Sequence, residues 1–247
     1  MLKVELMFCQ FNFFSYIYIE MKNSTEQIIK RIKRIGLTCT LNDNGTTRHF
    51  HNGHEYVEIG GIKWATMNIG ANSITDYGFY FQWGDTQGYT AEQVRNDEKK
   101  FDWDNYKYGT DGHLTKYNSS DKKSVLEPQD DAVTFNMGSG WRTPTREEFE
   151  VLMDSTTSKW VANYQGSGVN GRLFTDKKDN TKTLFFPAAG YCGDGSVLDV
   201  GSSGSFWSSS LLSSNVSNAR DLYFHSGSVN WDLSNRSYGF AVRGVVG

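Results

Sequence analysis

The stretch that decides the fold class runs from Phe206 to Arg243 and reads FWSSSLLSSNVSNARDLYFHSGSVNWDLSNRSYGFAVR. Apolar residues recur in it at every second position, as in Leu222 and Phe224 and again in Val229 and Trp231. Period two puts alternate side chains on opposite faces of a strand, so the pattern predicts strands with one buried face, continuing to Phe240 and Val242. The intervening positions are predicted on the other face: Asp221, Tyr223, His225, Asn230 and Asp232.

Those intervening residues have the composition of an antibody paratope, which is rich in Tyr, Ser, Asn and Gly with a few charges. Such side chains give contact area and adaptable hydrogen bonds at little cost in conformational entropy. The stretch therefore indicates a binding face on a rigid β scaffold.

Composition places the rest of the chain among large globular proteins. The 247 residues suffice for one large domain, or for one domain with an extension. Aromatic residues make up 15% of the chain, so rings are expected to fill core volume that the aliphatic residues do not. Glycine is abundant (25) and proline scarce (3), which predicts turns built on Gly, Asn, Asp and Ser. A formal net charge of −3 without a long basic stripe argues against a nucleic-acid partner.

Residues 1–53 are predicted to form an extension ahead of a main domain at 54–247. Ser24 and Gln27 fit a capping box, and isoleucines at helical spacing then predict a short basic amphipathic helix at about residues 25–35. Its isoleucine stripe would pack on the domain or join two copies of the chain, with membrane or nucleic-acid binding as alternatives. The aromatic run from Met7 to Ile19 is too short for a transmembrane helix and unlike a signal peptide, so no membrane segment is expected. It reads as a peripheral strand, or as a segment ahead of a true start at Met21.

Histidines and cysteines give no strong sign of metal or disulfide chemistry. The cysteines are too scattered for a disulfide framework or zinc-ligand spacing: Cys9, Cys39 and Cys192. His49, His51 and His54 form a cluster with Glu55, but this cluster lacks the helical spacing of an HExxH zinc motif. Neither a metal nor a cofactor is therefore expected.

The middle of the chain predicts further short elements. Residues 55–70 predict a β-hairpin that turns at Gly60-Gly61, and residues 184–190 predict a buried strand. A short helix is expected over residues 130–136, where Asp130 and Asp131 would cap its N-terminus rather than act as an acid–base pair.

A second helix is predicted to begin at Thr145. Thr145 and Glu148 form a capping box, and Phe149, Leu152 and Met153 lie on one helical face. The two predicted helices of the main domain are thus short.

Many short motifs resemble, in fixed order, the Fibrobacter succinogenes major paralogous domain family. They begin at His54-Glu-Tyr-Val, Lys63-Trp-Ala-Thr, Asn68-Ile-Gly-Ala, Asp76-Tyr-Gly, Trp83-Gly-Asp, Tyr106-Lys-Tyr, Leu114-Thr-Lys-Tyr-Asn, Leu126-Glu-Pro, Asp130-Asp-Ala, Trp141-Arg-Thr-Pro-Thr, Glu147-Glu-Phe, Phe186-Pro-Ala-Ala-Gly-Tyr, Phe206-Trp-Ser-Ser-Ser and Gly239-Phe-Ala-Val-Arg. The resemblance covers about residue 55 to the end. It implies an α+β, C-type-lectin-like fold with two short helices and antiparallel sheets, a fold shared with formylglycine-generating enzymes.

The C-terminal stretch also resembles the variable region of a target protein of a diversity-generating retroelement. In such systems template adenines are randomised, so that Asn codons become codons ending in C or T, which cannot specify Lys, Glu, Gln, Met or Trp. From Ala188 to Gly247 the chain contains no Lys, Glu, Gln or Met, and its tryptophans there are Trp207 and Trp231. Trp231 is therefore expected to be framework rather than a varied position.

The resemblance implies a variable ligand-binding region at about residues 205–243. Its expected varied positions are Leu212, Ser214, Val216, Asp221, Tyr223, His225, Gly227, Ser228, Asn230, Asp232, Leu233, Ser234, Ser237 and Tyr238. The strand members of this set are predicted on the face opposite Leu222, Phe224, Val229 and Trp231. An ordinary polar sheet face is the alternative interpretation.

Several residues that could carry chemistry have a simpler structural interpretation. The hydroxyls of Ser208-Ser-Ser210 lack a positioned base and are expected to satisfy backbone groups. Glu127-Pro-Gln129 only superficially resembles a calcium-lectin loop. Trp141 and Trp207 are expected in the core or lining a cleft, and Arg236 and Arg243 are expected to anchor the fold through carboxylate pairs.

The sequence thus predicts a non-enzymatic receptor- or adhesin-type protein with no catalytic residues. Its partner would be a protein or glycan on another cell or particle, and the protein would be displayed on a bacterial surface or phage virion. One alternative is a non-diversified lectin or adhesin module of the same family. The other is an oxidase of the formylglycine-generating type, although its paired cysteines are not matched by Cys192.

Overall fold

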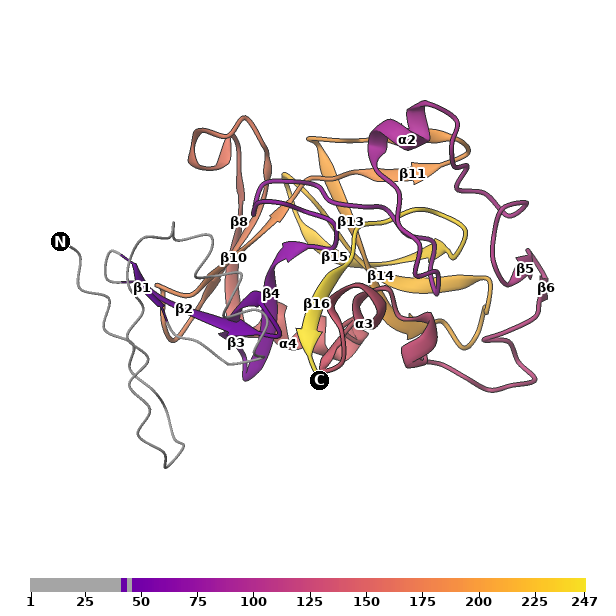
Figure 1. The fold of residues 1–247 in the computed structure, drawn as a ribbon, viewed down its shortest axis with the longest axis horizontal. Helices are drawn as coiled ribbons and strands as arrows, with labels where there is room; N and C mark the ends of the chain where they lie inside the picture. Colours follow the sequence, from indigo (N-terminus) through magenta and orange to yellow (C-terminus); the bar gives the residue numbers. More distant parts are fainter. Residues whose placement is uncertain (1–40, 44–45) are drawn as a thin grey trace, which may run out of the picture. The chain divides into compact units, whose positions relative to one another are not determined.

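The computed structural model describes residues 41–43 and 46–247, which form mainly antiparallel β-sheets with three α-helices (Figure 1). The chain divides into two compact units, one ending at Val57 and one running from Glu58 to Gly247. The expected helix at 25–35, the aromatic run at 7–19, and Cys9 and Cys39 lie outside the described residues. The longest described helix, α4, has 10 residues, and none of the described helices is long and apolar enough to cross a membrane.

In the N-terminal unit, strands β1 (Leu41–Asp43), β2 (Thr46–His51) and β3 (His54–Ile59) pair in antiparallel order. The predicted turn at Gly60-Gly61 is confirmed, since these glycines separate β3 from β4 (Ile62–Asn68) and have φ of 64° and 79°. A Cβ atom on Gly60 would lie 2.7 Å from the side chains of Val151 and Ser155, so helix α4 also requires glycine there.

The larger unit is built from several small antiparallel sheets. Strand β16 lies between β4 and β7; β9 lies between β8 and β10; and β14 lies between β13 and β15, while β5-β6 and β11-β12 are two-stranded. Their bounds are β5 (Gly109–Thr110), β6 (His113–Leu114), β7 (Trp141–Arg142), β8 (Thr156–Val161), β9 (Gly171–Asp176), β10 (Thr183–Pro187), β11 (Tyr191–Gly193), β12 (Ser196–Leu198), β13 (Ser203–Leu211), β14 (Asn218–His225), β15 (Val229–Asn235) and β16 (Arg243–Val246).

The helices are short and begin at side-chain caps. They are α2 (Ala91–Arg95), α3 (Ala132–Met137) and α4 (Arg146–Ser155), with 3-10 turns η1 (Pro128–Asp130) and η2 (Tyr164–Gly166). Asp131 caps α3 by accepting from the N–H groups of Val133 and Thr134, and the predicted Thr145 capping box of α4 is present. The expectation of only two helices is wrong, because Thr90 and Gln93 form a further capping box that starts α2.

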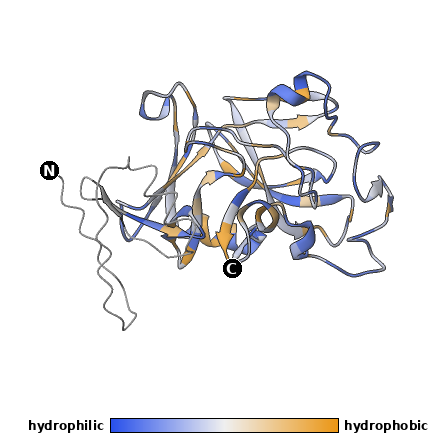
Figure 2. Cartoon of the chain, viewed as in Figure 1, coloured by the Kyte–Doolittle hydropathy of each residue, from blue (hydrophilic) through white to orange (hydrophobic). Residues whose placement is uncertain are grey.

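The core of the larger unit lies where α4, β10 and the β13-β14-β15 sheet meet. Phe186 on β10 packs against Phe149 of α4 and against Phe206 of β13, with ring centroids 6.5 and 4.8 Å apart. Phe206 in turn stacks on Phe224 of β14 at 5.9 Å. Hydrophobic residues concentrate in central strands such as β16, and the connecting loops are mainly hydrophilic (Figure 2). The aromatic content therefore fills the core as predicted.

Arg236 and Arg243 anchor the fold, but not through carboxylates, so that part of the expectation is wrong. Both are 0% exposed. Arg243 donates to Asn68 Oδ1 (2.9 and 2.7 Å) and to the carbonyls of Ala65 and Phe185 (3.0 Å each). Neutral carbonyl and amide oxygens thus satisfy a buried guanidinium.

Arg236 connects the C-terminal stretch to the segment around β6. Its guanidinium donates to Tyr106 Oη (2.8 Å), to the carbonyls of Tyr117 and Val216 (3.0 Å each) and to that of Lys116 (3.2 Å). It also lies 4.7 Å from the centre of the Trp83 ring, in cation–π geometry. The C-terminal stretch is therefore tied at its end to the segment that contains Tyr106 and Tyr117.

Candidate ligand-binding surface

The β13-β14-β15 sheet has two chemically different faces, and its register defines them. Leu222 of β14 pairs with Phe206 of β13 and Trp231 of β15, and Phe224 pairs with Gly204 and Val229. Residues paired directly across strands share a face, so this set forms the apolar face. The other face, called the polar face below, carries the buried Trp207 together with Ser203, Ser205, Asp221, Tyr223, His225, Ser228, Asn230, Asp232 and Ser234.

The apolar face is framework, as the alternation predicted. Phe206, Leu222 and Phe224 are each 0% exposed. Trp231 is partly exposed and packs on α4, with its ring 6.1 Å from Phe149 and 5.4 Å from the Arg146 guanidinium. This face holds the sheet against the core, whereas the polar face is exposed only in part, since Ser203, Ser205 and Asp221 on it are buried.

Three side chains at one end of the polar face, those of His225, Ser228 and Asn230, form a hydrogen-bonded cluster that Tyr223 adjoins. His225 Nδ1 accepts the backbone N–H of Gly227 (3.1 Å), so a neutral imidazole carries its proton on Nε2, which lies 3.0 Å from Ser228 Oγ. Asn230 Nδ2 donates to the same Ser228 oxygen at 2.8 Å. Tyr223 pairs with Asn230, and its ring lies 5.9 Å from that of His225. The side chains are thus held in place before any ligand arrives.

Asp221 departs from the prediction that it is an accessible contact residue. It lies on the polar face but is 1% exposed, and neither carboxylate oxygen has a hydrogen-bond partner. Burial, with a smaller contribution from Asp232, raises its pKa well above the ordinary value of 3.8, and the nearby Ser234 hydroxyl offsets this only in part. Asp221 is buried because it pairs with Trp207, and other segments of the chain cover the polar face at that end.

Two further expected contact residues are misplaced. Ser237 is 1% exposed, since Gln82 donates to its carbonyl and the segment is folded inward there. Leu233 pairs with Arg220, so it belongs to the Leu222 side of the sheet, although it is 44% exposed. A two-residue period places side chains on faces but does not tell which part of a face the rest of the chain covers.

The other expected positions do not all lie together. Leu212, Ser214 and Val216 precede β14, whereas Gly227 and Ser228 follow it. The eight residues of β14 span roughly 25 Å, so these two groups lie at opposite ends of the sheet. Ser234 lies near the first group, because it pairs with Ala219. The structure therefore brings Tyr223, His225, Ser228 and Asn230 together, and not the whole set.

Tyr238 joins this cluster through a residue that the sequence analysis missed. The rings of Tyr238 and of Tyr191 in β11 are 5.9 Å apart. Burial is the main cause of the raised pKa of Tyr191, and Tyr223 lies close enough to add a smaller contribution. The sequence analysis lacked the strand register. Gly190 pairs with Gly204, and this pairing aligns Tyr191 with Ser205. No pattern within the sequence of β11 alone gives that alignment.

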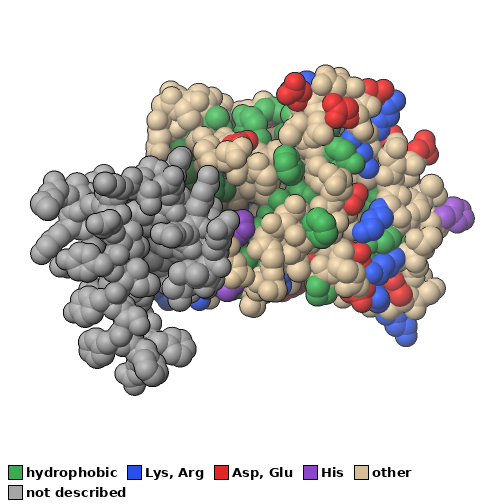
Figure 3. Space-filling model, viewed as in Figure 1, with side chains coloured by type: hydrophobic (Ala, Val, Ile, Leu, Met, Phe, Trp, Pro, Cys, Tyr) green, Lys and Arg blue, Asp and Glu red, His purple; other side chains and the backbone are tan. Residues whose placement is uncertain are grey.

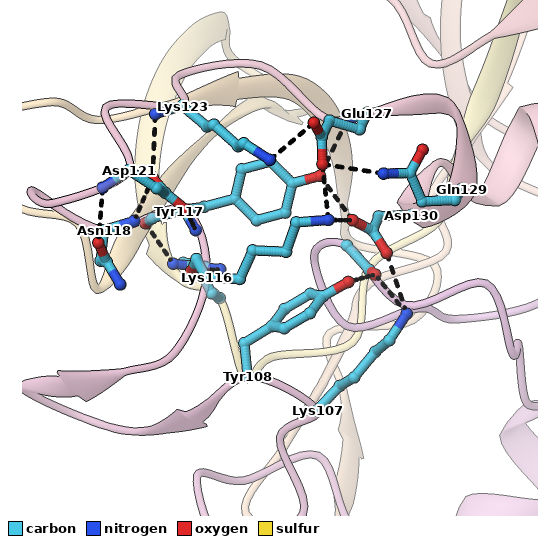
Figure 4. Close-up of polar contacts among 12 residues, drawn as sticks. Lys107, Tyr108, Lys116, Tyr117, Asn118, Asp121, Lys123, Glu127, Gln129 and Asp130 are labelled. Atoms are coloured by element: carbon cyan, nitrogen blue, oxygen red, sulfur yellow. Dashed lines mark hydrogen bonds and ion pairs between the residues drawn. The ribbon is translucent and has the colours of Figure 1, made fainter.

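A second polar cluster centres on Asp130, which is 5% exposed and was expected as a helix cap (Figure 4). Lys116 and Lys107 form ion pairs with its carboxylate, and Tyr117 Oη donates to it at 2.7 Å. Burial favours the neutral acid, but the bonds from Lys116 and the tyrosines prevail and lower its pKa to about 2. Glu127 also pairs with Lys116 and Lys123, at 2.7 Å each.

Every strong donor in that cluster has a partner within the fold. The lysine ammonium groups bind Asp130 and Glu127, and Gln129 donates to Glu127 at 2.9 Å (Figure 4). The face drawn in Figure 3 carries acidic and basic side chains intermixed over the right-hand part, with no area of one sign. The Asp130 cluster is therefore structural, and Glu127 has lysine partners rather than the arrangement of a calcium loop.

Catalytic chemistry has little support among the described residues. Cys192 is buried, and burial raises the pKa of its thiol to about 12, so it carries no nucleophilic thiolate. The Ser208 and Ser209 hydroxyls donate to the carbonyls of Arg220 and Pro144, as predicted. Residues 41–43 and 46–247 contain no group of three His, Cys, Asp or Glu side chains placed to hold a metal.

Trp141 and Trp207 are core residues, exposed by 1% and 2%. A small pocket that borders Trp207, Trp83 and Val242 has room for about one water molecule.

Comparison of the chain with protein-family models, curated proteins and solved structures finds no match in any of the three.

Proposed function

We propose that the protein is a non-enzymatic binding protein of the receptor or adhesin type, whose polar face is diversified by a retroelement. Its scaffold would be C-type-lectin-like, and its ligand a protein or glycan on another cell or particle. Display on a bacterial surface or a phage virion fits this role.

One observation carries the proposal. Tyr223, His225, Ser228 and Asn230, which codon logic selects as varied positions, lie together on one face of the β14-β15 ladder, while Leu222 and its framework neighbours lie on the other. Substitution on the polar face therefore leaves the core contacts in place. That separation is what a diversified binding surface needs.

The anchoring of the sheet supports the same function. β14 has β13 on one side and β15 on the other, and Arg236 fixes the segment beyond β15 to the region of Tyr106 and Tyr117. A rigid support lowers the entropy lost when a contact surface binds its ligand. The hydrogen bonds among His225, Ser228 and Asn230 have the same effect.

The DNA that flanks the coding sequence provides the test. We expect a reverse transcriptase gene and an imperfect repeat of the segment that encodes residues 205–243, differing from it at template adenines. The differing codons should include those of Tyr223 and His225, where the template should encode Asn, and spare those of Leu222, Phe224 and Trp231. Absence of the repeat would instead favour a fixed lectin or adhesin module, and differences at both sets would contradict the assignment of faces.

A further inference from the structure

The polar face extends beyond the variable stretch into the β11-β12 hairpin. Gly190 pairs with Gly204 in a parallel bridge, and its N–H donates to the Ser203 carbonyl at 2.8 Å. The strands are parallel at this bridge, so the residues that follow it, Tyr191 and Ser205, are neighbours in one row on the same face. Ser205 in turn pairs with Tyr223. Tyr191 is thus a fixed aromatic residue in the same surface as two varied ones, Tyr223 and Tyr238.

A small side chain separates two of these tyrosines. Ser205 lies between Tyr191 and Tyr223 in the row and is 4% exposed. The Tyr191 ring contacts that of Tyr238 at 5.9 Å and the buried Phe240 ring at 6.2 Å, which fixes its orientation. Tyr191 thus links Tyr223, across Ser205, with Tyr238, and the exposed Leu198, which pairs with Tyr191 in the hairpin, lies beside these rings.

The charges near these rings are acidic. Burial raises the pKa of Tyr191, and Asp194 and Asp199 lie close enough to raise it further. Asp232 is exposed on the same face of β15. A cation held by the negative faces of several rings and by nearby carboxylates is stabilised by both.

Most basic residues of this region are engaged elsewhere, although the exposed Arg95 lies near Cys192, the neighbour of Tyr191. Arg236 and Arg243 are buried, and Arg220 pairs with Leu233 on the opposite side of the sheet. Lys100, whose stem lies beside Gly195 in the hairpin turn, forms an ion pair with Asp97 at 3.4 Å. Lys99 donates to Gln82 at 2.9 Å.

Two buried side chains on the polar face, those of Ser203 and Asp221, lack hydrogen-bond partners. Ser203 Oγ and both oxygens of Asp221 have no hydrogen-bond partner, at exposures of 3% and 1%. Ser203 pairs with His225 and Asp221 with Trp207, so they lie on either side of the Ser205–Tyr223 row. Both side chains can accept a hydrogen bond from a donor.

We propose that the polar face binds a lysine or arginine side chain of a protein partner, with Tyr191 as a fixed aromatic wall and Tyr223 and Tyr238 as varied walls. The inference rests on the proposed function, because it names the ligand class of that surface. Since Tyr191 and the hairpin carboxylates lie outside the varied positions, variants that differ at Tyr223 retain the preference for a cation.

The test uses the full chain with isotope-labelled tyrosine rings, titrated by NMR with N-acetyl-arginine amide. The control ligand is N-acetyl-citrulline amide, which has the same shape without the charge. We expect the arginine compound to shift the rings of Tyr191, Tyr223 and Tyr238 in a salt-sensitive manner. Tyr164, which stacks on Phe185 at 3.9 Å, serves as the internal control and should not shift.

Substitutions then separate the role of Tyr191 from that of the surface as a whole. Tyr191→Leu should weaken arginine binding about three- to fivefold, as expected for one exposed cation–π contact. Tyr191→Phe should retain it, and Tyr164→Leu, the matched control, should leave it unchanged. Unaltered affinity in Tyr191→Leu would contradict the fixed wall.

The remaining outcomes distinguish this inference from the proposed function. Equal shifts with citrulline, or no shift with arginine, would overturn the cation preference. Shifts of the same rings by methyl glycosides alone would replace it with a glycan site and leave the binding surface standing. The repeat in the flanking DNA tests diversification independently, so its absence would remove the proposed function whatever the titration gives.

Discussion

Two buried aspartates, in different regions of the molecule, have opposite surroundings. Asp130 is held by two lysines and by tyrosine hydroxyls, and its pKa falls to about 2. Asp221 is buried more deeply, has no hydrogen-bond partner, and its pKa is raised. An ionised carboxylate is stabilised at the first position and destabilised at the second.

The difference bears on the diversification proposed for the C-terminal stretch. A buried acid that is permanent in a fold needs partners that neutralise it, and Lys107, Lys116 and Tyr117 supply them for Asp130. A position that changes by randomisation has no such matched partners. The unpartnered state of Asp221 is therefore consistent with a residue that arrived after its surroundings were set.

The prediction with the largest expected effect concerns the packing of the C-terminal sheet. It tests whether loose packing there explains why a buried Asp221 without a hydrogen-bond partner is tolerated. Phe224 is 0% exposed and packs between Phe206 and Trp160, with ring centroids 5.9 and 6.4 Å away. Phe224→Ala should lower the free energy of unfolding by about 3–5 kcal/mol, measured by urea denaturation. A loss under about 1 kcal/mol would mean a loose sheet, and the comparison of the aspartates would lose its basis.

The second effect concerns the partnered aspartate. Asp130→Asn removes the charge that Lys116 and Lys107 share, and should lower the free energy of unfolding by about 2–3 kcal/mol at pH 7. Because the folded pKa of about 2 lies below the ordinary 3.8, this stabilisation is complete above 3.8 and is lost as pH falls toward 2. Denaturation curves of both proteins should therefore converge at low pH. A constant difference across the range would refute the assignment to ionisation.

Sequence reasoning identified the alternation on which the comparison depends. Leu222 and Phe224 lie on the buried face because period two is a local property of a strand. The caps of α3 and α4 are equally local, since Asp131 and Thr145 bond to N–H groups within their own first turn. The same signal was present for α2 at Thr90 and was missed.

What the sequence could not give are the contacts between distant segments. Asp221 is buried because β13 places Trp207 beside it, and Asp130 is stabilised by Lys116 and Lys107 from the region of β5 and β6. Tyr191 belongs to the candidate surface through the Gly190–Gly204 bridge. Each depends on strand register or loop path, which no local pattern encodes.

The third effect has the opposite sign and concerns the unpartnered aspartate. Asp221→Asn should raise the free energy of unfolding by about 1–2 kcal/mol at pH 7, because no ionised carboxylate must then be buried. The folded pKa lies above 3.8, so the unfolded chain loses its proton first and the wild type is destabilised as pH rises past 3.8. The two proteins should thus be equally stable below that value and diverge above it. Destabilisation by Asp221→Asn at pH 7 would reveal a partner for the carboxylate.

The smallest expected effect is on the exposed part of the polar face. Tyr223 and His225 are partly exposed and contact other residues of the polar face rather than the core, so Tyr223→Ala with His225→Ala should change the free energy of unfolding by less than about 1 kcal/mol. Leu222→Ala, which alters the residue directly before Tyr223 on the same strand, is the matched control and should cost about 2–5 kcal/mol. Thermal melts of the three proteins measure both. Equal losses for the two faces would mean that Tyr223 and His225 are framework, and Asp221 would then need a structural explanation rather than one from diversification.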